Sequence, residues 1–255
     1  MNELAFYNQQ FEKYKKYDHH RSEGKDLNLD SAEGYFEYLV KSYSDLEGTL
    51  VDLGCGDGYF TSKLAELNGK VVGIEPSSLI NAANELLETK KLSNLKFLKE
   101  DAYKLSLADE SANLVISRRG PDPENEVHRV LKDEGLFIFI TIGEMDCFSL
   151  KKLVGRGQHF GNRGKVSEEL KVKFLTAGFT DVLCKDFFYL DIFKSGGDLK
   201  EFLHQVPIFD NFSKSDYPFV DAFSKNHKDN NIKLDSHRVV LLARKSAYKA
   251  VKSNS

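Results

Sequence analysis

The sequence predicts an α/β protein with a doubly wound, mostly parallel sheet that carries helices on both faces. From Thr49 onward, short apolar segments alternate with helical stretches of about 10–15 residues, a pattern typical of βαβ units. The apolar segments are continuous rather than alternating, as expected for strands that are buried on both faces. Right-handed crossovers then restrict the topology to a doubly wound sheet.

The predicted elements follow one another along the chain. We expect strands at 50–54, 70–76, 95–101, 113–119 and 136–143, and helices at 59–69, 77–91 and 123–135. A helix at 167–179 and two closing strands at 180–193 and 237–245 complete the series. The segment of about 195–232 is predicted to be an insertion of helices and loops that forms a small helical cap.

The N-terminal 45 residues are predicted to form a helical lid or cap. They contain an amphipathic helix at 4–17, a polar loop at 18–30 and a second helix that Asp30 or Ser31 caps. We therefore expect three parts: a lid at 1–45, a ligand-binding domain at 46–245, and a tail at 246–255.

Composition and charge exclude several classes of protein. No apolar run approaches the roughly 18 residues of a membrane span, and the first residues lack the apolar core of a secretory signal. The odd number of cysteines, without C-x-x-C pairs, argues against a disulfide framework or a zinc site, so we expect reduced thiols, a cytoplasmic location and no metal. A net charge of -3 gives no global attraction to nucleic acid, although it leaves a local basic patch open.

A glycine-rich motif, Asp52-Leu-Gly54-Cys-Gly56-Asp-Gly58, begins in the last residues of the first predicted strand and continues into the turn after it. Glycines at a strand-to-helix turn allow positive φ angles and a close approach of ligand to backbone. A dinucleotide site would have the spacing G-x-G-x-x-G, but here the spacing is G-x-G-x-G and Tyr59 occupies the place of the third glycine. A ligand without phosphate at this turn, such as the amino-acid end of S-adenosylmethionine (SAM), fits better.

Acidic residues end the next two predicted strands. Glu75, which precedes Pro76 and lies 21 residues after Gly54, is placed to accept hydrogen bonds from ribose hydroxyls. Asp101 is placed to accept from an adenine amino group, and the small Ala102 leaves room for the ring. The three markers occur in order at successive strand ends, where open α/β sheets bind ligands.

On these residues, the stretch 50–142 resembles a class I SAM-dependent methyltransferase domain of Rossmann-like fold; the segment EVHRVLKDEGLFIFI adds to the likeness. The resemblance implies seven strands, with the antiparallel strand 237–245 between 136–143 and 183–193. It implies SAM as cofactor and S-adenosylhomocysteine (SAH) as product. The implied cofactor-binding residues are Asp52, Gly54, Cys55, Gly56, Gly58, Glu75, Pro76, Asp101, Ala102, Ser117 and Arg118.

A second resemblance concerns the methyl acceptor. The segments ISRRGPDPENEVHRVLKDEG, DLKEFLHQVPIFDNF and HRSEGKDLNLDSAEG resemble the ribosomal large-subunit RNA guanine-N1 methyltransferases. We expect transfer of a methyl group to a nucleophilic nitrogen or oxygen, and the second likeness implies that the acceptor is a guanine base in ribosomal RNA. The chain lacks the four-cysteine zinc module of that family, which favours the alternative of a small metabolite. A non-catalytic SAM- or nucleotide-binding protein is the third hypothesis.

Candidates for catalysis are fewer. Arg118 and Arg119 lie at the end of the fourth predicted strand, where an arginine pair can bind an anionic or carbonyl-bearing acceptor. His20, on the N-terminal loop, is a candidate contributed by a lid. The sequence lacks an Asn/Asp-Pro-Pro-aromatic motif, which argues against exocyclic adenine or cytosine amines. The basic, glycine-rich stretch 156–165 is open to two interpretations, an RNA contact or a surface loop.

Overall fold

A seven-stranded sheet organises the part of the chain that the computed structural model describes, namely residues 8, 30–227 and 231–247. The strand order is β3-β2-β1-β4-β5-β7-β6. The strands are β1 (Thr49–Leu53), β2 (Lys70–Ile74), β3 (Leu95–Leu98), β4 (Ala112–Arg118), β5 (Leu131–Ile142), β6 (Phe179–Phe193) and β7 (Ile232–Lys245). Strands β1 to β5 pair in parallel, whereas β7 runs antiparallel between β5 and β6. The predicted fold class is confirmed, including the place of the antiparallel strand.

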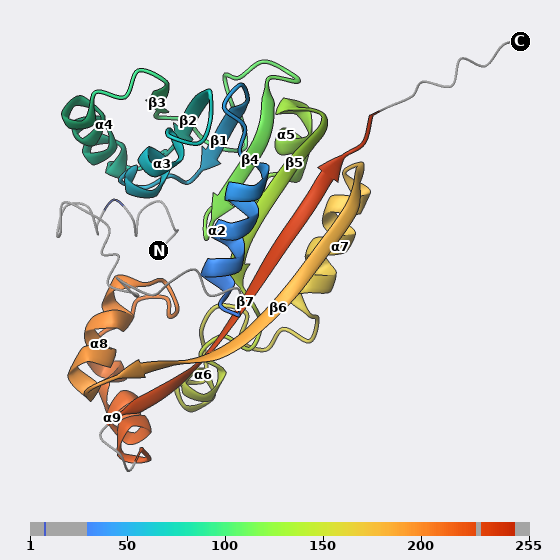
Figure 1. Cartoon of the computed structure of the whole chain (residues 1–255). Helices are drawn as coiled ribbons and strands as arrows, with labels where there is room; N and C mark the ends of the chain where they lie inside the picture. Colours follow the sequence, from blue (N-terminus) through green and yellow to red (C-terminus); the bar gives the residue numbers. More distant parts are fainter. Residues whose placement is uncertain (1–7, 9–29, 228–230, 248–255) are drawn as a thin grey trace, which may run out of the picture.

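Helices cover both faces of this sheet (Figure 1). One face packs on α2 (Ala32–Tyr43), α3 (Tyr59–Leu64) and α4 (Leu79–Lys90), and the other packs on α5 (Glu124–Val130) and α7 (Val166–Thr176). Each face has its own core of buried aliphatic and aromatic side chains. The strands between these two layers are therefore apolar throughout.

A small helical lobe lies at the far end of the long β6–β7 pair (Figure 1). It contains α8 (Gly196–Gln205), the 3₁₀ turn η1 (Lys214–Asp216) and α9 (Tyr217–Lys225), and α6 (Phe148–Val154) packs against it. A third apolar cluster, including Leu150, Leu199 and Phe223, joins these helices to the end of the β6–β7 pair. Of these elements, α8, η1 and α9 lie within the stretch of about 195–232 that was predicted to be a helical insertion.

Two predicted helices are much shorter in the structure than expected. The helix expected at 59–69 ends at Leu64, where the Asn68 side chain donates to the Leu64 carbonyl. The helix expected at 123–135 ends at Val130, and β5 begins five residues earlier than predicted. Tertiary pairing explains the second difference, because Leu131 pairs with Ala112 of β4 and its carbonyl accepts from the Lys245 ammonium.

The predicted cap of α2 is confirmed, since the Ser31 hydroxyl accepts from the backbone N–H of Gly34. α2 buries Phe36 and Val40 against the sheet, so the described part of the predicted lid contributes to the core. The helix expected at 4–17 and the loop expected at 18–30 lie almost wholly outside the described residues. None of the described helices is long and apolar enough to cross a membrane.

Candidate active site

The carboxyl ends of β1, β2 and β4 bring the predicted site residues together. Leu53 pairs with Ile74 of β2 and with Ser117 of β4, so the residues that follow these three positions meet at one edge of the sheet. The end of β3 lies beside that of β2, through the pairing of Ile74 with Leu98. This is the edge where open α/β sheets bind their ligands.

The turn after β1 is built on its three glycines. Gly54, Gly56 and Gly58 all have positive φ angles, of 72°, 58° and 75°. A Cβ at Gly58 would lie 2.5 Å from the Phe97 ring, so this position requires glycine for packing. A Cβ at Gly56 would meet none of the described residues within 4 Å, so that part of the chain leaves the space above Gly56 open. The turn therefore offers room for a ligand at Gly56 and not at Gly58.

The N–H groups of this turn already have partners. Those of Gly54 and Cys55 donate to the Ile74 carbonyl, at 2.9 and 3.0 Å. That of Gly56 donates to the Glu75 carboxylate at 3.0 Å. A pyrophosphate binds such a turn through its free N–H groups. Because these three donors are engaged, the turn is poorly suited to phosphate, which agrees with the choice of SAM over a dinucleotide.

Glu75 is buried, with 6 % of its surface exposed, and it braces the turn. One carboxylate oxygen accepts from Gly56, and the other accepts from the Ser77 N–H at 2.8 Å. A carboxylate offers about four lone-pair sites, so two remain for hydroxyl donors of a ligand. Pro76, between these residues, is half-buried and has no side-chain donor. The predicted ribose acceptor thus also holds the glycine turn in place.

Asp52 lies beneath the turn and is almost fully buried. Burial raises the pKa of Asp52 to about 6, although the hydrogen bond from Thr61 (2.6 Å) and the charge of Arg118 lower it. Burial likewise raises the pKa of the Cys55 thiol well above its ordinary value. Cys55 therefore stays a neutral thiol at neutral pH and is not a nucleophile.

Asp101 and Ala102 lie on the loop after β3. The exposed Asp101 accepts from the Tyr103 N–H at 3.0 Å, and its second carboxylate oxygen makes no hydrogen bond to the described residues. Ala102 is only 2 % exposed and belongs to the core. Asp101 is thus available to a ligand, while Ala102 anchors the loop.

The end of β4 carries the two arginines. The guanidinium of Arg118 lies over the Phe60 ring, 4.4 Å from its centroid, which is a cation–π contact. Burial, together with the charge of Arg119, lowers the pKa of Arg118. Arg119 has a left-handed φ of 58°, and its guanidinium lies 4.0 Å from the Glu33 carboxylate of α2. Arg118 therefore lies against α3, and Arg119 lies near α2.

Ser117, the third predicted residue of this segment, is fully buried. Its hydroxyl makes no hydrogen bond to the described residues. His20, the remaining catalytic candidate, lies outside the described residues. The sequence analysis missed Thr61, Ser77 and Phe60; of these, only Thr61 carried a signal, because it lies three residues after Gly58 in the first turn of the following helix.

The basic stretch 156–165 is largely occupied by internal contacts. Arg156 donates to the Asp216 carboxylate at 2.8 Å and to the Asp210 carbonyl at 2.9 Å. Lys165 lies 3.6 Å from Glu168 on the next helix. These contacts support the interpretation as a surface loop, since two of its three Lys and Arg side chains already have acidic partners.

Comparisons with known proteins agree with this geometry. A family profile described as "Methyltransferase domain" matches residues 45–185, more than half of the chain. The chain therefore belongs to the methyltransferase domain family, and the cofactor expected from the sequence agrees with this membership. No curated protein matches the sequence.

Solved structures show the same fold at low identity. The YcgJ protein from Bacillus subtilis is 15 % identical, with a TM-score of 0.62 over 84 % of this chain and 99 % of that one. A putative methyltransferase from Bacillus halodurans is 17 % identical, with a TM-score of 0.61 over 88 % and 100 %. A phosphoethanolamine N-methyltransferase of Haemonchus contortus, solved with SAH and phosphomonomethylethanolamine, is 18 % identical, with a TM-score of 0.55 over 84 % and 52 %. These matches establish the fold and leave the acceptor open.

Proposed function

We propose that this chain is a SAM-dependent methyltransferase that transfers a methyl group to a nitrogen or oxygen of a small molecule. The observation that supports SAM as the cofactor is the space at Gly56, which the described residues leave open, in a turn whose N–H groups at Gly54, Cys55 and Gly56 are already engaged. Membership of the methyltransferase domain family supports the reaction. SAH is then the product.

In this proposal, the buried and the exposed acidic residues bind different parts of the cofactor. Glu75 accepts hydrogen bonds from the ribose hydroxyls with the lone pairs that its backbone contacts leave free. Asp101 accepts from the adenine amino group beside Ala102. Asp52, once ionised, favours the ammonium group of the methionine half, and Arg118 favours its carboxylate. The turn at Gly54 to Gly58 supplies the space for this half.

SAM supplies an activated methyl group on a sulfonium, so the protein's task is alignment rather than covalent catalysis. An in-line displacement gains most of its acceleration from holding the acceptor in place. Arg119, beside the expected methyl position, is the candidate for orienting an anionic or carbonyl-bearing acceptor through forked hydrogen bonds. Glu33 at 4.0 Å is its present partner and is the contact that such an acceptor replaces.

The charge distribution favours a small acceptor over RNA. RNA binding relies on cations that are free to neutralise phosphates. Arg156 and Lys165, two of the three Lys and Arg residues in the 156–165 stretch, have acidic partners in the structure. Acidic side chains also lie around the site edge, including Asp57, Glu75 and Asp101. A phosphate backbone would therefore meet like charge there.

Calorimetric titration with SAM and SAH tests the cofactor. We expect binding to the wild-type protein and a loss of at least about tenfold in affinity for Asp101→Ala. An Arg244→Met variant, whose side chain lies at the opposite edge of the sheet, serves as control and keeps its affinity. If Asp101→Ala and Glu75→Ala both leave the affinity unchanged, the assignment of the cofactor site is wrong.

A salt-dependent gel shift with ribosomal RNA separates the two acceptor classes. A metabolite enzyme is expected to show no shift at low salt, whereas guanine methylation of ribosomal RNA requires one that weakens as salt rises. Incubation with radiolabelled SAM and a panel of small carboxylates, phenols and amines then identifies the acceptor. Tight SAM binding without transfer to RNA or to any small acceptor would indicate the non-catalytic alternative.

A further inference from the structure

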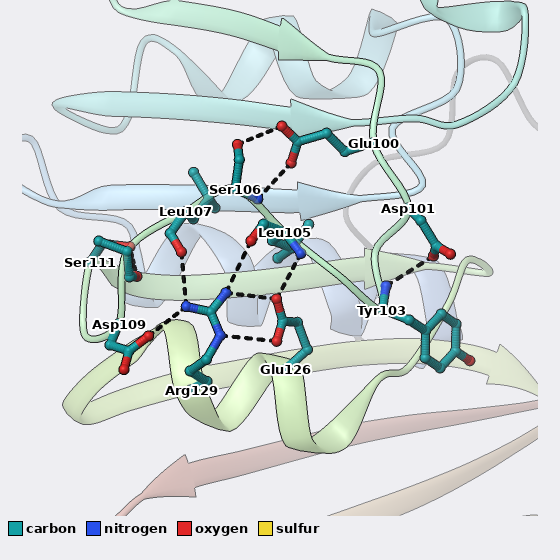
Figure 2. Close-up of polar contacts among 11 residues, drawn as sticks. Glu100, Asp101, Tyr103, Leu105, Ser106, Leu107, Asp109, Ser111, Glu126 and Arg129 are labelled. Carbon is teal, nitrogen blue, oxygen red and sulfur yellow. Dashed lines mark hydrogen bonds and ion pairs between the residues drawn. The ribbon is translucent and has the colours of Figure 1, made fainter.

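The loop that carries Asp101 and Ala102 connects β3 to β4 and contains no helix or strand. An irregular loop positions a binding group only if other contacts fix its backbone. Two side chains of α5, Glu126 and Arg129, lie against this loop (Figure 2). Neither residue was expected to belong to the site.

Arg129 and Glu126 are joined by a bidentate ion pair, which we call the fork, and both side chains form hydrogen bonds with the loop backbone. The two guanidinium nitrogens Nε and Nη2 donate to the Glu126 carboxylate at 3.0 and 2.6 Å. Nη1 donates to the carbonyl of Leu107 at 2.9 Å, and Nη2 donates to that of Leu105 at 3.2 Å. Glu126 in turn accepts from the N–H of Leu105 at 2.7 Å. The pair thus engages both polar backbone groups of Leu105.

A second contact closes the same loop. The Glu100 carboxylate accepts from the N–H of Ser106 at 3.0 Å and from its hydroxyl at 2.5 Å. The residue before Asp101 is therefore tied to the residue after Leu105 (Figure 2). Arg129 also donates to the Asp109 carboxylate at 2.6 Å, further along the loop.

Short local bonds transmit this restraint to Asp101. Its carbonyl accepts from the Lys104 N–H at 3.0 Å, and its carboxylate accepts from the Tyr103 N–H at 3.0 Å. Ala102 and Leu105 are 2 % and 7 % exposed and pack in the same core cluster. Asp101 thus sits on a tight turn whose far end is held by the fork.

Charge keeps the fork closed at neutral pH. The hydrogen bond to Glu126 raises the pKa of Arg129, and the bond from Arg129 lowers the pKa of Glu126. A planar guanidinium can donate hydrogen bonds to a carboxylate and to two carbonyls at once, whereas the ammonium of lysine cannot reproduce that geometry.

We propose that Arg129, with Glu126, is a positioning residue for adenine recognition, because it fixes the loop that presents Asp101. This inference rests on the proposed function, in which Asp101 accepts a hydrogen bond from the adenine amino group. Loss of the fork should then weaken recognition of that amino group selectively. It should leave contacts to the rest of the cofactor nearly unchanged.

The test compares SAH with S-inosylhomocysteine, in which a carbonyl replaces the adenine amino group. The wild-type protein should bind SAH at least about tenfold more tightly, because the carbonyl cannot donate to Asp101. Asp101→Ala should remove this preference. Arg129→Met should lower the affinity for SAH about five- to tenfold and change that for the inosine analogue less than about twofold. Arg129→Lys should resemble Arg129→Met, since lysine cannot form the fork.

Arg244→Met is the matched control. Arg244 is 33 % exposed against 31 % for Arg129, and it lies within 4 Å of two carboxylates at the opposite edge of the sheet. We expect it to keep the wild-type preference. If Arg129→Met folds poorly, Glu126→Gln is the second variant, because it weakens the acceptor of the Leu105 N–H while Arg129 keeps its carbonyl contacts.

The outcomes separate the two hypotheses. A wild-type protein without preference, or a preference that Asp101→Ala leaves intact, overturns the proposed role of Asp101 and with it the inference. A preference that Asp101→Ala removes but Arg129→Met and Glu126→Gln retain overturns the positioning role alone. An equal loss of affinity for both ligands in these variants also overturns it, because that result indicates general damage.

Discussion

The Thr61 hydroxyl donates a 2.6 Å hydrogen bond to the Asp52 carboxylate, entirely within the protein and directly below the glycine turn. Thr61 is the only hydroxyl donor to Asp52 among the described residues. Burial nevertheless raises the pKa of Asp52 to about 6. The ionisation of Asp52 thus falls within a range of pH that can be tested.

We expect Asp52 to make the protein less stable as pH rises toward neutrality. A group whose pKa is raised on folding contributes stability below its ordinary pKa, near 3.8, and loses it as pH rises through about 6. A shift of about two units corresponds to about 3 kcal/mol. Asp52→Asn should therefore flatten the pH dependence of the free energy of unfolding between about pH 4 and 6. Denaturant titrations across this range measure it; an unchanged slope contradicts the raised pKa.

The same ionisation should control cofactor binding. If ionised Asp52 favours the ammonium group of the methionine half, affinity for SAH should rise as pH increases through about 6 and level off above 7. Thr61→Val should move this transition to higher pH, because the hydrogen bond from Thr61 lowers the pKa of Asp52. Calorimetry between pH 5 and 8 provides the measurement. A pH-independent affinity in the wild-type protein would place Asp52 away from the cofactor.

Gly56 and Gly58 should respond differently to alanine. Both have positive φ, so either substitution costs about 1–2 kcal/mol in backbone strain. At Gly58 the new methyl group also collides with Phe97 and with Ala83, and overpacking of this kind adds about 1–3 kcal/mol. At Gly56 it enters space that none of the described residues fills and that we assign to the ligand.

Gly58→Ala should therefore lose stability, whereas Gly56→Ala should stay folded and lose affinity for SAH by at least about tenfold. Thermal unfolding and calorimetry on the two variants measure both effects. Tight SAH binding by a folded Gly56→Ala protein would show that the ligand does not occupy this space.

Glu75→Gln should affect binding more than folding. Glutamine keeps an oxygen for one backbone donor, Gly56 or Ser77, but loses the charge and presents an amide nitrogen to the other. We expect SAH affinity to fall about 10- to 100-fold, as for hydrogen bonds to a charged group. Adenosine, which retains the ribose, should lose a similar factor, and adenine should lose almost none. An equal loss for adenine would contradict the ribose assignment.

Sequence patterns predicted the sheet and the acidic residues at its strand ends, because both follow from the succession of segments along the chain. Alternation of apolar and helical segments locates strands, and parallel strands bring their carboxyl ends to one edge. Patterns failed where tertiary pairing overrides local propensity. Helical periodicity continues through Leu131, yet that residue pairs with Ala112 and starts β5.

The contacts that support the site residues also form between segments that are distant in sequence. The fork of Arg129 and Glu126 acts on backbone groups more than 20 positions earlier in the chain. Backbone hydrogen bonds carry no residue signature, so the spacing of acids and bases could not reveal them. For the same reason, the sequence could not show that the N–H groups of Gly54, Cys55 and Gly56 already have partners. These engaged donors support SAM over a dinucleotide.

A buried ion pair connects β7 to the segment after β5. Arg238, 1 % exposed, donates to the Asp146 carboxylate and to the His237 carbonyl. Burial alone would raise the pKa of Asp146, but the charge and hydrogen bond of Arg238 outweigh it and lower that pKa. The pair lies next to Cys147, where the core of the helical lobe begins. It is therefore placed to fix the lobe on the sheet.

Removal of either charge should be costly. Arg238→Met leaves Asp146 buried without its partner, and such losses typically amount to about 3–5 kcal/mol. The double variant Arg238→Met with Asp146→Leu should recover part of this loss, because no unpaired charge remains.

Because the pKa of Asp146 is lowered, its contribution to wild-type stability is present above its ordinary pKa, near 3.8, and is lost only as pH falls below that value. Denaturant unfolding of both variants, with Arg244→Met as a surface control, measures these differences, and a single variant as stable as the control would show that the pair does not stabilise the fold.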